Sequence, residues 1–322
     1  MCTSLSVGLG KTGKGILFGR NMDIESHFGE RVVIVPREMP LRFRCLPELE
    51  HHYAIIGMAA VADGYPLFAD AMNEKGLCMA GLHFPGNAVY ETPGGFDADH
   101  RRVAPFELIP YLLGTCATVT QVREALGRTV ISDIHFSREL LNTPLHWHVA
   151  GVDGGVIIEV TASGLQLYED RVGVLTNNPP YPYHVAHLHR YDGLDSGLPS
   201  RLNREGQPPL GETYDLGLGM VGLPGDYSSP ARFVRCATLR RLTAWDVLSR
   251  KEAEGQFFRL LGAVAPPVGC VKTPGGENHT TIYTCCMDTA TLTYTLLTAD
   301  DIMPRRTVLD EALCCGKTLK LI

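Results

Sequence analysis

The spacing of apolar residues along the chain predicts alternating blocks of strands and helices. Stretches with period-two alternation, or short apolar runs bounded by glycine or proline, indicate strands. They cover residues 2–7, 16–20, 31–36, 52–58, 77–82, 145–150, 155–160, 173–177, 280–287, 291–297 and 317–322. Apolar residues three or four positions apart predict helices over 104–115, 118–126, 231–249 and 251–263. This order predicts one α+β domain spanning 1–322, with helices packed on sheets and no βαβ repeat.

The segments between these blocks predict turns and one long loop. Residues 8–15 are rich in glycine, but they lack the Walker spacing of a phosphate loop and join two strands, so we expect a hairpin turn. Residues 70–77 also indicate a turn. Residues 192–226 are rich in glycine, proline and polar residues. A loop of that length in a compact chain is usually functional or an assembly arm.

Composition excludes several classes of function. The formal net charge is −6 and no basic run occurs, which argues against nucleic acid or an anionic membrane as partner. No apolar stretch has the length of a membrane span, and the first residues do not resemble a secretory signal. We therefore expect a cytoplasmic protein. The ten cysteines contain no CxxC pair, so we expect most to be buried small side chains, with redox or metal binding as the alternative.

Cys2 is the first candidate for chemistry. Removal of Met1 would place a thiol and a free α-amine on one residue, the arrangement of an N-terminal nucleophile that carries its own base. An α-amine suits this role because its ordinary pKa is about 7.7, near working pH. The alternative is a buried cysteine in a first strand.

Arg20 lies on the strand expected to pair with that of Cys2, and Asp23 lies at the exit of that strand. Asp23 is a candidate to accept hydrogen bonds from the α-amine. Arg20 is a candidate cation near the thiol, since a nearby positive charge lowers the pKa of a thiol and favours thiolate. The alternative is a solvated ion pair at the end of a hairpin.

Two later residues carry weaker signals. Asn177 ends an apolar strand just before two prolines, where its carboxamide N–H could donate to an oxyanion, although Asn before Pro is also common in turns. Arg232 lies at a predicted helix start, where a cation is unfavourable to the helix dipole. Its position indicates a local need for positive charge.

Taken together, the motifs resemble the choloylglycine hydrolase family, which comprises bile salt hydrolases and penicillin V acylases within the N-terminal-nucleophile hydrolases. The matching segments recur in the family's order over nearly the whole chain. They lie at residues 1–4, 18–25, 72–77, 143–147, 175–177, 222–226 and 231–233.

The resemblance implies a four-layer αββα sandwich of two antiparallel sheets in a bacterial cytoplasmic enzyme. It implies a homotetramer with no metal and no cofactor. Cys2 would be the nucleophile and its own amine the base, and Met22 would line the acyl pocket. The other active-site positions of the family fall on Arg20, Asp23, Asn177 and Arg232.

His83 departs from the family pattern, because bile salt hydrolases usually carry Asn and penicillin V acylases Tyr at this position. Its backbone N–H can serve an oxyanion whatever the side chain, so we expect the side chain to shape the pocket wall or to have no part. His83 does not decide between the two branches, but the residues after Cys2 and those at 145–147 favour the first, so the resemblance implies a bile salt hydrolase acting on glycine- or taurine-conjugated bile salts. The alternatives are a penicillin V acylase or a non-catalytic thiol protein.

Overall fold

Two antiparallel sheets form the centre of the molecule. The computed structural model describes residues 1–10, 14–94, 101–197 and 216–322. The first sheet has the strand order β12-β1-β2-β13-β14-β15. Its strands are β1 (Cys2–Gly8), β2 (Ile16–Ile24), β12 (Val174–Leu175), β13 (Thr280–Asp288), β14 (Thr293–Thr298) and β15 (Arg305–Val308).

The second sheet packs against the first and has the order β11-β10-β9-β6-β5-β4-β3-β16. Its strands are β3 (Arg31–Val35), β4 (Ile55–Ala62), β5 (Tyr65–Asn73), β6 (Cys78–His83), β9 (Leu145–Gly151), β10 (Gly154–Thr161), β11 (Gly164–Glu169) and β16 (Lys320–Leu321). A short parallel pair, β7 (Arg101–Val103) and β8 (Thr129–Ile131), lies apart from both sheets.

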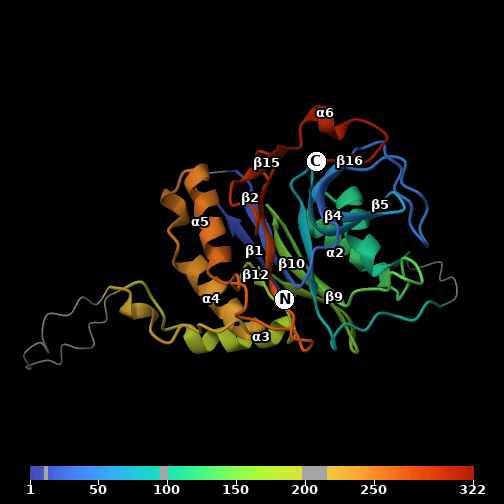
Figure 1. Cartoon of the computed structure of the whole chain (residues 1–322). Coiled ribbons are helices and arrows are strands. Elements are labelled where there is room, and N and C mark those ends of the chain that lie inside the picture. The colour runs from blue at the N-terminus through green and yellow to red at the C-terminus, as the bar shows by residue number, and fades with distance from the viewer. Residues whose placement is uncertain (11–13, 95–100, 198–215) are drawn as a thin grey trace, which may run out of the picture.

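Helices cover the outer face of each sheet, which gives the expected four layers (Figure 1). On one side, α4 (Ser229–Leu242) and α5 (Arg250–Gly262) pack on β1, β2 and β13, and α3 (Tyr181–Leu188) packs on α4. On the other side, α1 (Leu108–Thr115) and α2 (Val119–Leu126) pack on β5, β6, β9 and β10. Within the described ranges, no helix is long and apolar enough to cross a membrane.

Strand β3 shows how the sequence specifies these layers. Val32 and Ile34 point into the core between the sheets, whereas Val33 and Val35 point into the core beneath α1 and α2. Both faces are apolar because the second sheet is buried on both sides. The apolar run therefore indicated a strand but could not tell which neighbours it would have.

Helix ends agree with the sequence signals where a polar cap is present. The Thr118 side chain accepts from Gln121 N at the start of α2, and Ser249 and Glu252 form a capping box at the start of α5. The helix expected over 231–249 is too long, because α4 ends at Leu242. Thr243 N and Oγ1 both donate to Leu239 O, so the last turn is closed locally, and only a short 3-10 turn (Trp245–Val247) follows.

The turn expected over 70–77 is also wrong in its first half. Strand β5 continues to Asn73, and the reversal occupies only the next few residues. Polar residues indicated a turn here, but Asp70 and Asn73 are fully buried. Asn73 Oδ1 accepts from the N–H groups of Lys75 and Leu77, so its polarity serves the turn from within the strand. Strands β5, β11 and β15, the β7–β8 pair and helices α3 and α6 (Glu311–Cys314) were not predicted.

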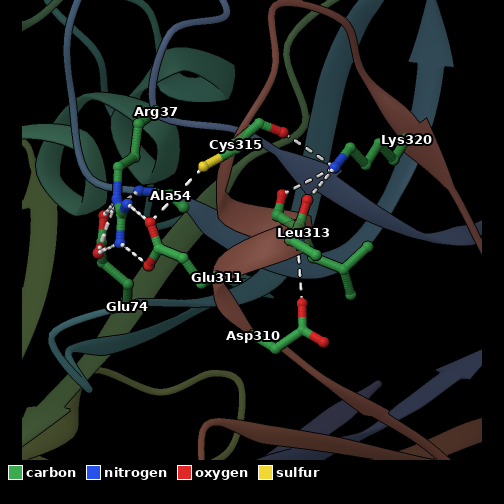
Figure 2. Close-up of polar contacts among 9 residues, drawn as sticks. Arg37, Ala54, Glu74, Asp310, Glu311, Leu313, Cys315 and Lys320 are labelled. Carbon is green, nitrogen blue, oxygen red and sulfur yellow. Dashed lines mark hydrogen bonds and ion pairs between the residues drawn. The ribbon is translucent and has the colours of Figure 1, made fainter.

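Polar contacts hold the C-terminal segment to the edge of the second sheet (Figure 2). Arg37 follows β3 and bonds both Glu74 and Glu311, so it joins this sheet to α6. Lys320 donates to the carbonyls of Ala312, Leu313 and Cys315 at the end of α6, where the helix dipole favours a cation. The final strand, expected over 317–322, pairs with β3 over Lys320–Leu321.

Candidate active site

Strand pairing brings Cys2 to its expected neighbours. Cys2 lies opposite Met22 in the β1–β2 ladder, so Arg20 and Asp23 flank it on the adjacent strand. The Cys2 side chain is buried, with 4% exposed area, and its Sγ lies 4.0 Å from Met22 Sδ. The expected partner strand is therefore confirmed, and it extends to Ile24, so Asp23 lies within it.

Met1 continues the β1–β2 ladder by one residue. Asp23 N donates to Met1 O at 3.1 Å, and the Met1 amine donates to Asp23 O at 2.8 Å and contacts His279 Nε2. Burial lowers the pKa of this amine below its usual value. With Met1 attached, the nitrogen of Cys2 is a peptide N–H and has no basic lone pair.

Asn177 joins three parts of the site. Its Oδ1 accepts from Cys2 N at 2.7 Å and from Arg232 Nη2 at 2.8 Å. Its Nδ2 donates to His83 O at 2.7 Å. Phe84 N bonds Pro144 O across the β6–β9 ladder, so the N–H and C=O of His83 both point to the other edge of β6, where Asn177 lies. The His83 N–H therefore faces the same side of β6 as Asn177.

The contacts of Arg232 explain why a cation lies at the start of α4. Its guanidinium is fully buried and donates to Tyr227 O, Cys2 O, Thr3 Oγ1 and Asn177 Oδ1. Burial lowers the pKa of Arg232, and the charges of Asp23 and Cys2 partly offset this effect. The sequence indicated a local need for positive charge at this helix start. In the structure this charge holds the first residues of β1 and the side chain of Asn177.

Arg20 is also fully buried, on the side of Cys2 that faces the second sheet. Its Nη1 donates to Ala69 O at 3.2 Å and to Gly81 O at 2.5 Å, and its Nη2 lies 3.5 Å from Met22 Sδ. Burial alone would lower the pKa of Arg20, but nearby negative charge, chiefly that of Cys2, outweighs it and raises the pKa. Arg20 is therefore a buried cation close to Cys2.

Asp23 has one carboxylate oxygen without a partner. Its Oδ1 accepts from Thr281 Oγ1 at 2.6 Å, whereas the buried Oδ2 has no hydrogen-bond partner among the described residues. An unpaired buried carboxylate oxygen is costly. Its place next to the N-terminal residues suits an acceptor for the amine that Met1 removal would create.

Part of this group of residues lines a cavity of about 1020 Å³. Cys2, Arg20, Met22, Asp23 and His83 all contribute to its lining, as does His279. The walls are mainly apolar and come from three parts of the chain: Val61, Leu67 and Phe68; Phe106, Ile109, Phe136, Leu140, Leu141 and Trp147; and Val271 and Pro274. Such a cavity suits a large apolar ligand with one polar end.

Several residues of the site carried no signal in the sequence. His279 contacts the Met1 amine with one ring nitrogen, and its Nδ1 lies 3.2 Å from Glu25 Oε2. Thr281 lies opposite Asp23 in the β2–β13 ladder, a pairing of residues 258 positions apart. His184 contacts Asn177 O through Nε2 at 2.8 Å. Each is placed by tertiary pairing, and no local motif marks such a pairing.

Comparison with known proteins identifies the family. The sequence model of the linear amide C–N hydrolases, choloylglycine hydrolase family, matches residues 2–312. The chain belongs to the choloylglycine hydrolase family. It is similar to the bile salt hydrolase/transferase of Lactiplantibacillus plantarum, at 43% identity over 84% of this chain and 82% of that protein. It is also similar to the bile salt hydrolase/transferase of Clostridium perfringens, at 36% identity over 89% of this chain and 86% of that protein.

Solved structures agree with this membership of the choloylglycine hydrolase family. A variant of the conjugated bile acid hydrolase from Clostridium perfringens superposes with a TM-score of 0.89 at 33% identity, covering 100% of this chain and 96% of the other. The penicillin V acylase of Agrobacterium tumefaciens superposes with a TM-score of 0.74 at 19% identity, over 99% of this chain and 90% of that one, which shows a shared fold alone. The chain therefore has the N-terminal-nucleophile hydrolase fold and is a linear amide C–N hydrolase.

The cysteines give little support to the rival thiol protein. All ten are free thiols and seven of them are buried. Burial raises the pKa of Cys78, Cys285 and Cys286 well above the usual value, which makes them poor thiolates. The expectation that most are buried small side chains is confirmed.

Proposed function

We propose that this chain is a bile salt hydrolase that uses Cys2, after removal of Met1, to cleave the amide of glycine- or taurine-conjugated bile salts. The observation that carries the proposal is the hydrogen bonding of Asn177 to Cys2 N and Arg232, next to an apolar cavity that Cys2 and Asp23, with its unpartnered oxygen, both line. The similar proteins named bile salt hydrolases support the substrate class.

The chemistry follows from these contacts. Asn177 Oδ1 and Asp23 Oδ2 would hold the freed α-amine, and this amine would take the proton of the Cys2 thiol. The sulfur would attack the amide carbonyl, while Asn177 Nδ2 and the His83 N–H would bind the oxyanion. The protonated amine would then protonate the leaving glycine or taurine, and water would cleave the thioester to release the bile acid.

Substrate selection would rest on the cavity walls. Its volume of about 1020 Å³ and its aromatic and leucine lining suit a steroid bound by burial of apolar area. The anionic amino acid would lie at the other end, close to His83 and His279. No step of this chemistry uses a metal or a cofactor.

A product assay tests the proposal. Purified enzyme is incubated side by side with glycocholate, taurocholate and penicillin V, and the released amine or acid is measured. We expect hydrolysis of the conjugated bile salts and its loss in Cys2→Ser, because a hydroxyl is a far weaker nucleophile near neutral pH. Exclusive cleavage of penicillin V would assign the alternative activity.

The mass of the expressed chain separates the hydrolase from a thiol protein. A hydrolase should lack Met1 and be alkylated fastest at Cys2, as peptide mapping would show. A chain that keeps Met1 and binds zinc would support the rival.

We further propose one N-terminal-nucleophile hydrolase domain over 1–322, assembled as a homotetramer in the bacterial cytoplasm. The family match over 2–312 supports the single domain. The loop at 192–226 supports the assembly, although its residues 198–215 lie outside the described ones. We expect light scattering to give four times the chain mass, and a deletion within the loop to lower it. A wild-type monomer at micromolar concentration would contradict the tetramer.

A further inference from the structure

Arg20 is a buried cation without a carboxylate in contact. Its guanidinium donates to the carbonyls of Asn21, Ala69 and Gly81 and contacts Met22 Sδ, and among the described residues it forms no ion pair. Removing a guanidinium from water is costly unless other negative charge compensates it. Cys2 supplies such charge only as thiolate, so the site needs a second source that persists when the thiol is protonated.

Asp70 lies next to this guanidinium in the core between the sheets. It follows Ala69, whose carbonyl accepts from Arg20, and it pairs in register with Ala80, next to Gly81, whose carbonyl also accepts from Arg20. Arg20 in turn pairs in register with Cys285, and Cys285 Sγ lies 3.4 Å from Asp70 Oδ1. The two side chains thus occupy the same layer from opposite sheets.

The hydrogen-bond partners of Asp70 suit its ionised form. Tyr283 donates to Oδ2 at 2.6 Å and Tyr294 donates to Oδ1 at 2.7 Å, and the Cys285 thiol points to the same oxygen as Tyr294. Every contact is a donor, which is the arrangement a carboxylate requires. The pKa of Asp70 is nevertheless raised above its ordinary value, because burial outweighs the lowering effect of the Arg20 charge and of these donors.

We propose that Asp70 is the permanent counter-charge of Arg20 and a positioning residue for the Cys2 nucleophile. The inference rests on the proposed role of Cys2. Arg20 lies between two negative groups, the Cys2 thiolate on the cavity side and the Asp70 carboxylate on the core side. The negative charge of Asp70 offsets the free-energy cost of burying the Arg20 guanidinium. It also limits how strongly Arg20 stabilises the Cys2 thiolate.

Other titratable groups also face Cys2 and Asp70. Around Cys2 they are its own α-amine, Arg20, Asp23 and Glu25 of the β2 segment, His83 of β6, Arg232 of α4 and His279 before β13. Around Asp70 they are Arg20, Tyr283, Cys285, Tyr294 and Cys78.

The test is the pH profile of Cys2 alkylation by iodoacetamide, followed by peptide mass on the chain lacking Met1. In Asp70→Asn the charge that opposes Arg20 is removed, so the midpoint for Cys2 should move to lower pH by roughly half a unit. Arg20→Gln should move it to higher pH. A profile of Asp70→Asn that superposes on wild type would overturn the proposal.

A matched control uses another buried carboxylate. The Asp170 side chain is 1% exposed and accepts from Tyr181 and Gly173 N, with His148 as its ion-pair partner. Asp170→Asn should lower Tm and leave the Cys2 midpoint in place. An equal shift in both variants would mean that loss of any buried carboxylate moves Cys2, which would contradict a specific role for Asp70.

Thermal unfolding gives a second readout. If Asp70 compensates Arg20, Asp70→Asn should lower Tm by fewer degrees in the Arg20→Gln background than in wild type. Additive losses would contradict the pairing. If Asp70→Asn does not fold, Tyr283→Phe/Tyr294→Phe keeps the carboxylate but removes two donors. That variant should add a second inflection to the alkylation profile where Asp70 takes up a proton, and a single unshifted inflection would contradict the proposal.

Alkylation requires no substrate. Failure of bile salt hydrolysis would therefore leave this experiment readable, and failure of this experiment would leave the proposed activity standing.

Discussion

At the scale of single residues, Asn177 combines two tasks in one side chain. Its oxygen accepts from Cys2 N and from Arg232, and its nitrogen donates to His83 O. The sequence suggested only a donor for an oxyanion. The structure adds an acceptor for the nitrogen of Cys2, the nucleophile that we propose, so loss of this side chain would remove both contacts.

We therefore expect Asn177→Ala to lower kcat for every substrate by about 10²–10³-fold, the cost of one lost oxyanion donor or somewhat more. A group that stabilises the transition state acts whatever the acyl chain. The measurement is kcat and KM on glycocholate, taurocholate and penicillin V. Loss confined to one substrate would contradict this role.

His83 should behave differently, because only its backbone is assigned to the oxyanion. Its side chain lines the cavity, and burial lowers the pKa of its ring. We expect His83→Ala to change the ranking of the three substrates more than it lowers the best rate, and His83→Asn to preserve bile salt hydrolysis. A uniform loss as severe as that of Asn177→Ala would make the ring catalytic.

Some residues of the site can be identified from the sequence, and others only from the structure. Cys2, Arg20 and Asp23 lie in local segments whose chemistry is visible in the sequence. Asp70, by contrast, lay in a segment expected to be a turn, and its partners Tyr283 and Tyr294 are more than 200 positions away. Tertiary packing decides which charged residues become buried between the two sheets, and the hydrophobic periodicity of the sequence does not identify them.

At the scale of elements, the segment after β12 shows what proline does and does not reveal. The prolines after Asn177 indicated that the strand expected over 173–177 ends before them, but β12 is shorter and already ends at Leu175. They did not indicate that α3 begins at Tyr181, although Pro182 lies in the first turn, where proline is well tolerated. Helix α3 matters because it carries His184 to the backbone of Asn177.

His184 should make stability depend on pH. Its ring stacks on Phe233 with centroids 4.8 Å apart, and its buried Nδ1 has no partner among the described residues. Burial lowers its pKa from the ordinary 6.5 to about 4 in the folded state. Between these values the unfolded chain binds a proton that the folded chain does not. Stability is therefore complete above pH 6.5 and is lost as pH falls towards 4.

We expect this loss to reach about 2 kcal/mol by pH 5, since one pKa unit corresponds to about 1.36 kcal/mol. His184→Gln should be less stable at pH 7.5 but should lose about that much less between pH 7.5 and pH 5. The measurement is the urea midpoint of both proteins at the two pH values. Parallel curves would show that His184 does not titrate on unfolding.

At the scale of the whole molecule, the two sheets were predictable only in part. The hairpins of β1 with β2 and of β13 with β14 are local and were expected. The β2–β13 pairing, which joins the two ends of the chain, was not, since it depends on which apolar faces meet after collapse. The cavity is likewise assembled from loops after β2, before α1, before β9 and before β13, so its shape could not be predicted.

The same loops place exposed apolar side chains at the rim of the cavity, where they are not part of the hydrophobic core. Leu140 and Leu141 line the cavity, yet they are 46% and 65% exposed. Single exposed leucines are ordinary, but adjacent ones on a substrate cavity mark a binding surface. They would be covered when a steroid binds.

Leu141→Ser should therefore raise KM for conjugated bile salts about fivefold with little change in kcat. Covering part of a leucine contributes about 1 kcal/mol, and the contact is the same in the ground state and the transition state. Val152→Ser is the matched control, because Val152 is 74% exposed on the β9–β10 turn and does not line the cavity. Steady-state kinetics on glycocholate separate the two. A raised KM in both variants, or a fall in kcat in Leu141→Ser alone, would mean that the rim does not bind the steroid in the way the cavity indicates.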